Sequence, residues 1–388
     1  MDFKLTKEQE NIQKMMKNIC EKEVAPGVKE RDLEPDPKKS FDSAYDILMH
    51  KMAPLGLMSL WYPKEYGGLE LGYVSLALAA LELNKVEVGF GTAYGVHMGL
   101  ATYAIPKYGN KEQKDKWLGG IAKGETLCSF GLTEPNAGSD AAMQQTTAVL
   151  DGDEYVLNGS KIYITNSGYS DLYMVYAMTD QSKGTKGISC FVVEKDTPGL
   201  TIGPASNKMG IRASIQCELY FDDMRIPKFN RIGEEGEGFK IAMNSLNLGR
   251  VAVAAQGAGN AMGALEDARK YAKERIQFGK PIIKQQSVQN LLSDMAVKCE
   301  TAKLLILYAA WLGDQGKPFA KEASMAKLYA TDIGMEVTTD AIQVYGGAGF
   351  LRDHQVERRM RDAKILQIYE GTNQIQRGII AGMLERED

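Results

Sequence analysis

The amino-acid sequence predicts an α+β protein in which two helical regions flank a single β region. Apolar residues recur at helical spacing in the first third and again after Gly238, whereas residues 146–227 contain short runs rich in β-branched and aromatic side chains. Because the strands cluster and do not alternate with helices, a doubly wound parallel sheet is not expected. A chain of 388 residues also exceeds one ordinary hydrophobic core. We therefore expect three domains, at residues 1–125, 126–235 and 236–388.

The composition is that of a globular chain without a dominant charge. Lys and Arg number 46 against 50 Asp and Glu, which leaves a net charge of −4 with no long run of one sign. Binding to nucleic acid or to an anionic membrane requires a concentrated basic face, so neither partner is expected. The longest apolar stretch, Val74 to Leu81, is about half of what a bilayer span requires. Residues 1–10 lack a signal-peptide core, and we expect a cytoplasmic protein without membrane insertion.

Cysteine and histidine spacing indicates neither a disulfide framework nor a metal site. The five cysteines are scattered without a C-x-x-C pair, and the three histidines are isolated. We expect a reducing compartment and no bound metal.

The first third is predicted to be helical, element by element. A helix from Leu5 to Ala25 begins with a capping box formed by Thr6 and Gln9, and Pro26 is expected to end it. Further helices are predicted at residues 44–55, 73–84 and 111–123, with a turn at residues 63–68.

The central region is predicted to be an antiparallel sheet. Its expected strands are residues 146–150, 155–159, 161–166, 172–179, 187–194 and 217–226. The dipeptides Asp151-Gly152 and Asn158-Gly159 are typical of hairpin turns.

Long helices are predicted for the last third, at residues 239–276, 289–312, 321–344 and 375–384. The glycines Gly257, Gly259 and Gly263 resemble a dinucleotide-binding fingerprint, but the third glycine comes one residue late and the surroundings are helical. We interpret these glycines as sites of close helix packing.

Five segments carry a resemblance to a known family. They are FGLTEPNAGSD at 130–140, GSKIYITN at 159–166, RIQFGK at 275–280, QVYGG at 343–347, and MRDAK at 360–364 leading to IYEGTNQIQ at 368–376. In this order the chain resembles the acyl-CoA dehydrogenase family of flavoenzymes over essentially its whole length. The resemblance implies a helical domain, a β domain and a C-terminal four-helix bundle. It also implies FAD held between domains, completed by a second subunit of a homotetramer that is a dimer of dimers.

Glu370 is the candidate catalytic base. It lies on a short joint between the apolar segment 365–369 and a helix in which Asn373 and Gln376 are spaced as a capping box. From position alone, such a carboxylate is usually a solvated loop charge. The resemblance implies instead the base that removes the α-proton of an acyl thioester, in one of the family's two placements. The other placement is Gly249, which cannot act as a base.

This chemistry requires a carboxylate with a pKa raised by burial, and stabilisation of the developing enolate oxygen. The resemblance implies that the oxygen is bound by the backbone N–H of Glu370 and by a ribityl hydroxyl of the flavin. The β-hydrogen then leaves as hydride to flavin N5.

The resemblance implies two sets of FAD contacts. The first comprises Phe130, Leu132, Thr133, Gly138, Ser139, Tyr163, Thr165, Thr372 and Gln374. The second, which touches the FAD of the neighbouring subunit, comprises Arg275, Phe278, Gln286, Gln343 and Gly347. Simpler alternatives are a polar turn at 132–140, an exposed strand tyrosine at 163, where many members carry Trp, and a solvated Arg275.

Substrate contacts are implied for Ser139, Tyr94, Asn247, Arg250, Tyr369 and Gly371. Arg250 matches an arginine that contacts coenzyme A, although Asn247 stands where the family often has Asp. Tyr94 is expected to shorten the far end of the acyl pocket; the alternative is that it packs among helices. Because only the neutral His97 is nearby, a dicarboxylic substrate is disfavoured, and a short, branched or alicyclic acyl group is expected.

The expected activity is FAD-dependent oxidation of an acyl-CoA to the 2-enoyl-CoA, with electrons passed to an electron-transferring flavoprotein. An acyl-CoA oxidase or an enoyl-CoA reductase acting on the same bond is the alternative enzyme. A catalytically silent acyl-CoA-binding or assembly protein is the alternative outside enzymes.

Overall fold

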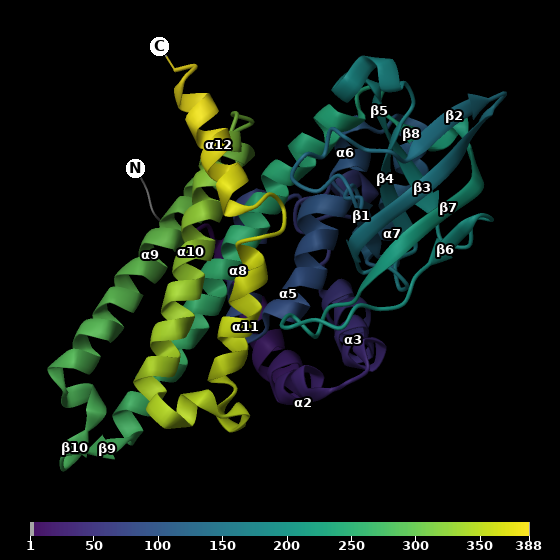
Figure 1. The fold of residues 1–388 in the computed structure, drawn as a ribbon. Coiled ribbons are helices and arrows are strands. Elements are labelled where there is room, and N and C mark those ends of the chain that lie inside the picture. Colours follow the sequence, from purple (N-terminus) through teal and green to yellow (C-terminus); the bar gives the residue numbers. More distant parts are fainter. Residues whose placement is uncertain (1–3, 388) are drawn as a thin grey trace.

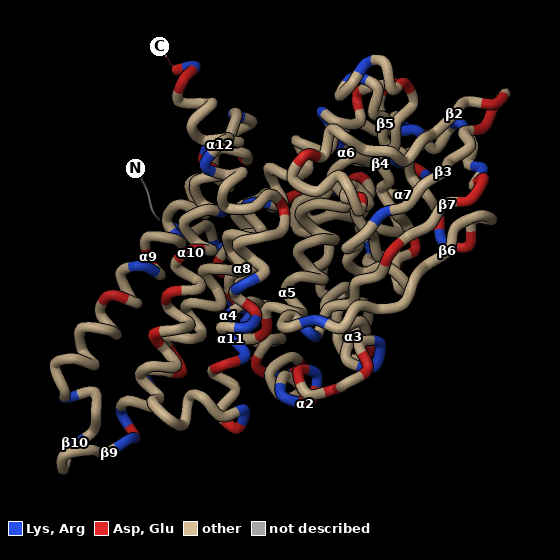
Figure 2. The backbone as a smooth tube through the Cα atoms, in the orientation of Figure 1, with Lys and Arg blue, Asp and Glu red and all other residues tan. Residues whose placement is uncertain are grey.

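A computed structural model describes residues 4–387. Figure 1 shows the long C-terminal helices standing side by side, the β sheet at the other side of the molecule, and helices of the first third such as α2, α3 and α5 between them. The main hydrophobic core lies among the helices, and a second, smaller core lies within the β domain. Figure 2 shows basic and acidic residues interspersed along the chain. No helix within residues 4–387 has both the length and the apolar character needed to cross a membrane.

The first helix begins with the predicted capping box and ends at Ile19, but a run of further helical segments continues past the predicted end at Ala25. In α1 (Lys7–Ile19) the Thr6 side chain accepts from the Gln9 N–H and the Gln9 side chain binds the Thr6 N–H, which confirms the capping box. Pro26 does not end the helical run, because it lies in the first turn of a new segment where no hydrogen bond is lost. The chain passes through a π-helical turn (Cys20–Val24) and a 3₁₀ turn (Ala25–Gly27) into α2 (Val28–Leu33).

The N-terminal region contains five further α-helices, two of which, α4 and α5, are largely or wholly buried. They are α3 (Pro37–Asp46), α4 (Gly72–Val86), α5 (Val88–Gly95), α6 (Ala104–Tyr108) and α7 (Lys111–Lys123), with π-helical segments at Ile47–Met52 and Val96–Ala101. The predicted bounds of α7 are confirmed. Every residue of α5 is buried, so this helix lacks the one-sided apolar stripe by which a surface helix is recognised.

The β domain contains eight strands in one sheet. They are β1 (Cys128–Gly131), β2 (Thr147–Asp151), β3 (Glu154–Thr165), β4 (Leu172–Met178), β5 (Ile188–Glu194), β6 (Leu200–Ile202), β7 (Gln216–Pro227) and β8 (Arg231–Ile232). The order is β6-β7-β3-β2-β4-β5-β8, with β1 also on β4. The prediction of a wholly antiparallel sheet is wrong at β4, which pairs in parallel with β1 and, at one residue pair, with β2. Long connections, unlike hairpins, allow neighbouring strands to run in the same direction.

One of the two predicted hairpin turns is present. Asp151 pairs with Glu154 and Gly152 adopts φ +62°, which confirms the β2–β3 turn. The turn predicted at Asn158-Gly159 is wrong, because β3 continues through it. Gly159 instead marks a bulge, where the register against β7 shifts and φ is +140°.

Five helices build the C-terminal region. They are α8 (Gly238–Glu274), α9 (Gln286–Asp314), α10 (Ala320–Tyr345), α11 (Val356–Leu366) and α12 (Asn373–Leu384), and a small hairpin of β9 (Ile276–Gln277) and β10 (Lys280–Pro281) follows α8. The sequence did not predict α11, because charged residues occupy its buried positions: Arg358 and Asp362 form a buried ion pair at 2.9 Å.

The glycines of α8 allow close helix packing, as interpreted from the sequence. A Cβ on Gly257 would lie 2.6 Å from the Ala330 carbonyl oxygen on α10, and one on Gly263 would lie 2.2 Å from the Lys85 carbonyl oxygen on α4. The middle of α8 therefore packs closely against α10 and α4. Its N-terminal part contacts the β domain (Figure 1).

Candidate active site

Glu370 lies on the loop between α11 and α12 in an unusual backbone conformation. Glu370 and Gly371 have φ of +54° and +88°, a left-handed region that side chains other than glycine rarely adopt. The Gln376 amide donates to the carbonyl oxygens of Glu370 (3.1 Å) and Gly371 (3.0 Å), which fixes this turn from the α12 side. The capping box predicted for Asn373 and Gln376 is wrong. Thr372 caps α12 by accepting from the Ile375 N–H. The Asn373 side chain is bound to α10, and the Gln376 side chain is bound to the loop.

The Glu370 carboxyl group is buried and points toward α8. Its Oε2 atom accepts no hydrogen bond from any residue in the described range, and a Cβ on Gly249 would lie 2.3 Å from that atom. Burial raises the pKa of Glu370 to about 7, while the nearby Arg250 and Lys327 cations oppose the rise. The structure therefore provides a carboxyl group that can hold or release a proton near neutral pH.

Two further polar groups border this carboxylate. On α8, Arg250 is buried and donates to Asn247 Oδ1 at 2.9 Å, and burial lowers the pKa of its guanidinium. Beside Glu370, the Tyr369 hydroxyl donates to Gln256 Oε1 and lies 3.5 Å from Thr92 Oγ1. Of the predicted substrate contacts, the structure thus gathers Asn247, Arg250, Tyr369 and Gly371 around Glu370.

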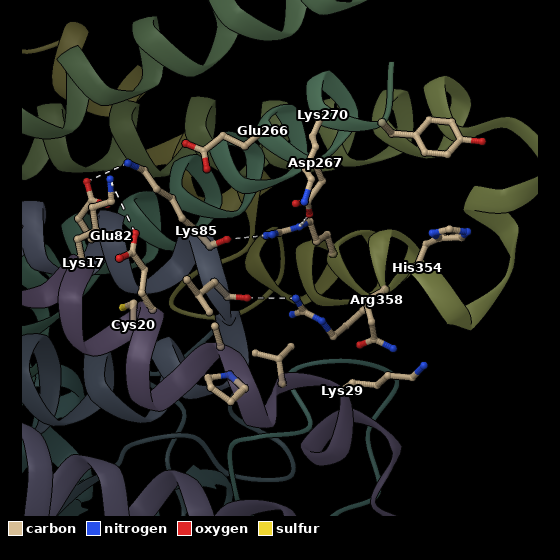
Figure 3. A pocket seen from close by; sticks show the side chains of 18 of the residues that line it. Lys17, Cys20, Lys29, Glu82, Lys85, Glu266, Asp267, Lys270, His354 and Arg358 are labelled. Carbon is tan, nitrogen blue, oxygen red and sulfur yellow. Dashed lines mark hydrogen bonds and ion pairs between the residues drawn. The ribbon is translucent and has the colours of Figure 1, made fainter. Parts of the chain in front are cut away.

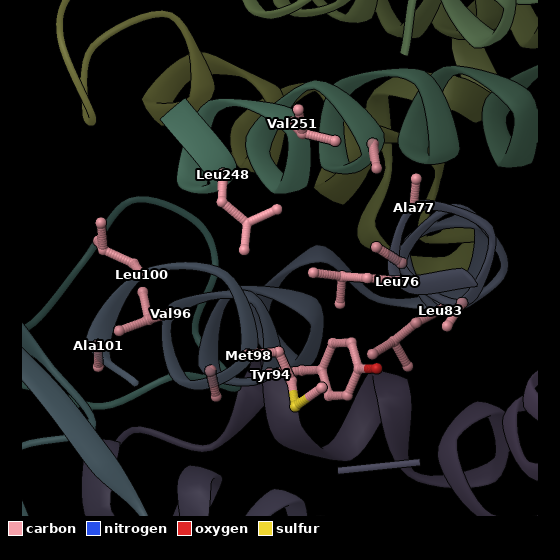
Figure 4. Close-up of a cluster of buried hydrophobic side chains, with 14 of the residues drawn as sticks. Leu76, Ala77, Leu83, Tyr94, Val96, Met98, Leu100, Ala101, Leu248 and Val251 are labelled. Atoms are coloured by element: carbon pink, nitrogen blue, oxygen red, sulfur yellow. The ribbon is translucent and has the colours of Figure 1, made fainter. Parts of the chain in front are cut away.

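Tyr94 does not belong to this group. Its side chain is fully buried, and its hydroxyl donates to the Leu57 carbonyl oxygen at 2.9 Å. Figure 4 shows the ring beside Met98, on the side of this helical segment away from α8. Tyr94 thus packs among helices in this structure, and the expectation that it closes the acyl pocket stays a prediction. The face toward α8 carries Gly95 and Gly99 instead, since residues four apart share one helix face.

The first set of predicted FAD contacts lies mainly at the edge of the β domain facing the helices. Phe130 and Leu132 are buried, Thr133, Thr165 and Thr372 are half-buried, and Gly138, Ser139, Tyr163 and Gln374 are exposed. Tyr163 is 65% exposed at φ +61°, and a Cβ on Gly138 would meet no atom within 4 Å. This open loop and uncovered aromatic ring leave room for a planar group.

A buried ion pair beneath this loop was missed by the sequence reasoning. Lys161 donates to the Leu132 carbonyl oxygen (3.0 Å), Glu134 Oε1 (2.7 Å) and Gln144 Oε1 (2.9 Å). The Glu134 carboxylate also accepts from the Gln145 and Thr146 N–H groups. The available signal was a lysine directly before the apolar residues Ile162, Tyr163 and Ile164, within a segment already singled out.

The second set of predicted FAD contacts lies far from Glu370. Its members, Arg275, Phe278, Gln286, Gln343 and Gly347, are all exposed. From residue 249 to residue 274, α8 extends about 37 Å at roughly 1.5 Å per residue. Arg275 forms no ion pair with a residue of the described range, and Phe278 is 92% exposed beside the β9–β10 turn. The two sets therefore lie at opposite ends of α8 (Figure 1).

A wide groove elsewhere on the molecule does not include Glu370. This groove of about 1330 Å³ lies between α1, α4, α8 and α11, where side chains of both charge signs face one another (Figure 3). Many of these charges are already satisfied within the chain; for example, Arg359 binds Asp267 at 2.7 Å and the Lys85 carbonyl oxygen at 2.8 Å.

Metal-ligating side chains do not converge in the part of the chain that the structure describes. No group of three or more His, Cys, Asp or Glu residues within 4–387 is arranged to hold a metal ion, and the five cysteines are buried and free. Burial lowers the pKa of His97 to about 4, and its Nδ1 accepts from the Cys128 N–H, so this histidine is neutral.

Comparison with known sequences decides the family. Residues 6–125, 129–224 and 236–384 match the acyl-CoA dehydrogenase N-terminal, middle and C-terminal domains, respectively. The chain belongs to the acyl-CoA dehydrogenase family. The predicted family and its α+β fold are confirmed, and the chain is an oxidoreductase and a flavoprotein of fatty acid metabolism that depends on FAD. The exposed Tyr163 ring and the open space at Gly138 fit such a cofactor.

Relatives of this acyl-CoA dehydrogenase align over nearly their whole length. A short-chain specific acyl-CoA dehydrogenase of Clostridium acetobutylicum is 46% identical, covering 100% of both chains. An acryloyl-CoA reductase (NADH) of Anaerotignum propionicum is 45% identical, covering 98% of this chain and 95% of the other.

Solved structures match equally well. Butyryl-CoA dehydrogenase from Megasphaera elsdenii has a TM-score of 0.96 at 44% identity, with 100% of both chains covered. A chain from a structure described as "Electron transferring flavoprotein of Acidaminococcus fermentans: Towards a mechanism of flavin-based electron bifurcation" has a TM-score of 0.95 at 49% identity, again with 100% of both chains covered.

Proposed function

We propose that this dehydrogenase oxidises the Cα–Cβ bond of a short-chain acyl-CoA to the trans-2-enoyl-CoA, with Glu370 as the base. The observation that carries the proposal is the Glu370 carboxylate, whose buried Oε2 accepts no hydrogen bond from residues 4–387 and whose pKa burial raises to about 7. A base with a pKa near the working pH is both ionised and strong enough to take a proton. The α-proton goes to Glu370. Bound FAD supplies the acceptor for the β-hydride, which balances the reaction.

The chain's own residues orient the thioester in this proposal. The Glu370 N–H donates to the thioester oxygen as negative charge develops there, and the loop bonds from Gln376 keep that donor in place. Arg250, Asn247, Ser139 and Gly371 contact the coenzyme A portion. The residues of the first set, from Phe130 to Gln374, hold the FAD of their own subunit.

We propose a short acyl group because a polar side chain, Gln256, lies further along α8 from the Glu370 carboxylate. Gln256 lies two helical turns along α8 from Gly249, about 10 Å away, and its side chain is hydrogen-bonded to Tyr369 and to the Gly91 carbonyl oxygen. An acyl chain running along α8 would reach this polar group after a few carbons. Further methylenes would have to displace satisfied hydrogen bonds. The short-chain name of the Clostridium acetobutylicum relative supports the same range.

The test is an anaerobic titration of the purified holoenzyme with a panel of acyl-CoA thioesters while flavin bleaching is followed. Butyryl-CoA is expected to bleach the flavin fastest, with branched and alicyclic thioesters included as the alternatives. Palmitoyl-CoA or glutaryl-CoA as the best substrate would contradict the acyl-group assignment. Absence of bleaching by every thioester would contradict the dehydrogenase function.

For the electron acceptor we propose an electron-transferring flavoprotein, supported by the 49% identical chain from the Acidaminococcus fermentans structure. We also propose a cytoplasmic homotetramer with domains at 1–125, 126–235 and 236–388. An exposed apolar row on α9 supports assembly: Val297 is 67%, Leu304 47%, Tyr308 48% and Trp311 43% exposed. In that assembly Arg275, Phe278, Gln286, Gln343 and Gly347 contact the partner's FAD.

A second candidate is the reverse reaction, reduction of a 2-enoyl-CoA. The 45% identity to an acryloyl-CoA reductase favours considering it. Reduced enzyme would then be reoxidised by acryloyl-CoA faster than butyryl-CoA reduces the oxidised enzyme. Rapid reoxidation by oxygen alone would point instead to an acyl-CoA oxidase.

A further inference from the structure

We propose that Lys327 is a positioning residue for Glu370. Its ammonium group holds the turn that carries the base, and its charge favours the ionised carboxylate. The inference rests on the proposed role of Glu370.

Lys327 is a buried cation without an ion-pair partner among residues 4–387. Its side chain on α10 is 0% exposed. The ammonium group donates to the Gly371 carbonyl oxygen at 2.8 Å and to Asn373 Oδ1 at 2.7 Å, and it forms no ion pair with a residue in the range 4–387. Buried lysines are rare unless they are paired, and an apolar side chain would fill the same space at lower cost. The position of this charge therefore calls for a functional explanation.

The acceptors of Lys327 are themselves fixed by α10. Asn373 donates to Thr331 Oγ1 at 2.9 Å and to Asp332 Oδ1 at 2.7 Å. The same Asp332 oxygen accepts from the Gln367 amide at 2.8 Å. Residues of α10 thus bind both ends of the α11–α12 loop, Gln367 at its start and Asn373 at its end. Between these two contacts, Lys327 binds the left-handed turn at Gly371.

Charged and titratable groups face Glu370 from three elements. Arg250 approaches from α8 and Lys327 from α10, and both oppose the rise in the pKa of Glu370 that burial causes. On the same loop, Tyr369 stays neutral because burial raises its pKa far above the usual value. Asp332 is the other acid that acts on Lys327, and it is already bound by Asn373, Gln367 and Arg377.

Lys327 and Glu370 support each other's charged forms. Burial lowers the pKa of Lys327 to about 7, and the carboxylate of Glu370 is the largest influence in the opposite direction. The two groups therefore titrate as a coupled pair. Without the lysine charge, only Arg250 opposes the rise in the pKa of Glu370 that burial causes. Glu370 then keeps its proton to higher pH.

The experiment compares three substitutions in the FAD-loaded enzyme. Lys327→Met removes the charge and the hydrogen bonds, and Lys327→Gln removes the charge but can still donate to the Gly371 carbonyl oxygen. Lys321→Met is the matched control, because Lys321 lies on the same helix but pairs with Glu387 at the surface. Single-turnover flavin reduction by butyryl-CoA is measured between pH 5.5 and 9.5, values chosen to bracket about two units on either side of neutrality.

We expect both Lys327 variants to move the acid limb of the profile upward by about one unit or more, which is about a tenfold loss of rate on that limb. The Gln variant is expected to regain close to the wild-type rate at high pH, whereas the Met variant stays lower because the loop is no longer held. An acid limb that is unchanged in both Lys327 variants, or shifted equally in Lys321→Met, would overturn the proposal.

A second measurement does not require turnover. Infrared titration of the oxidised holoenzyme follows the protonated carboxyl band of Glu370, which is assigned by its loss in Glu370→Gln. The band is expected to persist to higher pH in Lys327→Gln than in the wild type, and an unchanged midpoint would refute the charge effect. If instead Glu370→Gln kept its reduction rate, the proposed base would fail while the infrared result on Lys327 still stood. If Lys327→Met does not fold, Lys327→Gln and the conservative Lys327→Arg, which should keep the wild-type midpoint, carry the test.

Discussion

Gly249 on α8 faces the Glu370 carboxylate so closely that a Cβ at residue 249 would lie 2.3 Å from Glu370 Oε2. The same Cβ would lie 3.2 Å from Leu100 Cδ1, so a methyl group at residue 249 would be crowded from the Leu100 side as well. Residues 249 and 370, the two positions that the sequence resemblance implies for the base, are far apart in the sequence but adjacent in space. A side chain at residue 249 would occupy the space of the Glu370 carboxylate, so only one of the two positions can carry a side chain there.

Gly249→Ala is expected to displace Glu370 and to slow flavin reduction by at least about tenfold, because a misplaced base loses its near-attack geometry. The matched control is Gly382→Ala on α12, where a Cβ would meet no atom within 4 Å. Stopped-flow reduction by butyryl-CoA measures both. The double variant Gly249→Glu/Glu370→Gly should recover part of the lost rate, and an unimpaired Gly249→Ala enzyme would contradict this geometry.

Glu370→Gln is expected to bind FAD and butyryl-CoA normally and to lose about two to four orders of magnitude in flavin reduction. In the wild type, burial raises the pKa of Glu370 to about 7, and only the ionised form accepts a proton. The reduction rate should therefore rise with pH through this value and fall as the pH drops below it. Near wild-type reduction by the variant would require a different base.

Lys161→Met is expected to destabilise the fold by about 3–5 kcal/mol, because it leaves the buried Glu134 carboxylate without its partner. Urea unfolding measures the change. Adding Glu134→Gln should recover part of the loss, since the unpaired charge is then removed. Lys111→Met, which breaks an exposed pair with Asp115, is the control and should cost less than about 1 kcal/mol. Equal effects of the two lysine substitutions would contradict the role given to the buried pair.

Subunit mixing tests whether the two FAD contact sets complete one site from two chains. Arg275→Ala should lower FAD retention and Glu370→Gln should lower reduction, each in a homo-oligomer. When the two variants are co-expressed, Glu370 of one subunit and Arg275 of the other restore an intact site. Activity above that of both parents is expected in the purified mixed oligomer. No recovery, with mixed oligomers demonstrated by mass, would show that each site is contained within one chain.

Periodicity predicted the elements with a clear apolar face or a strong cap, such as α1 and α7. It missed α5, which is buried on all sides, and α11, where the Arg358–Asp362 pair occupies buried positions. For the site, motif resemblance singled out Glu370, whose role as the base stays a prediction. The buried Lys161 and Lys327 were not found, because a lysine in a helix or strand is normally a surface residue until its neighbours in space are known. The Tyr94 hydroxyl is bound to the Leu57 carbonyl oxygen, a contact between distant parts of the sequence that periodicity could not show.

The left-handed backbone at Glu370 has a consequence for how this position tolerates change. A non-glycine residue at φ +54° costs on the order of 1–3 kcal/mol, and Gly or Asn would occupy this turn with less strain. Asp would also suit the backbone better, but its carboxylate would stop one methylene short of the space above Gly249. Selection for folding stability alone would thus remove the glutamate. With the proposed role of Glu370 as the base, this residue is a stability–activity trade-off: backbone strain is accepted so that the longer side chain places its carboxylate at Gly249.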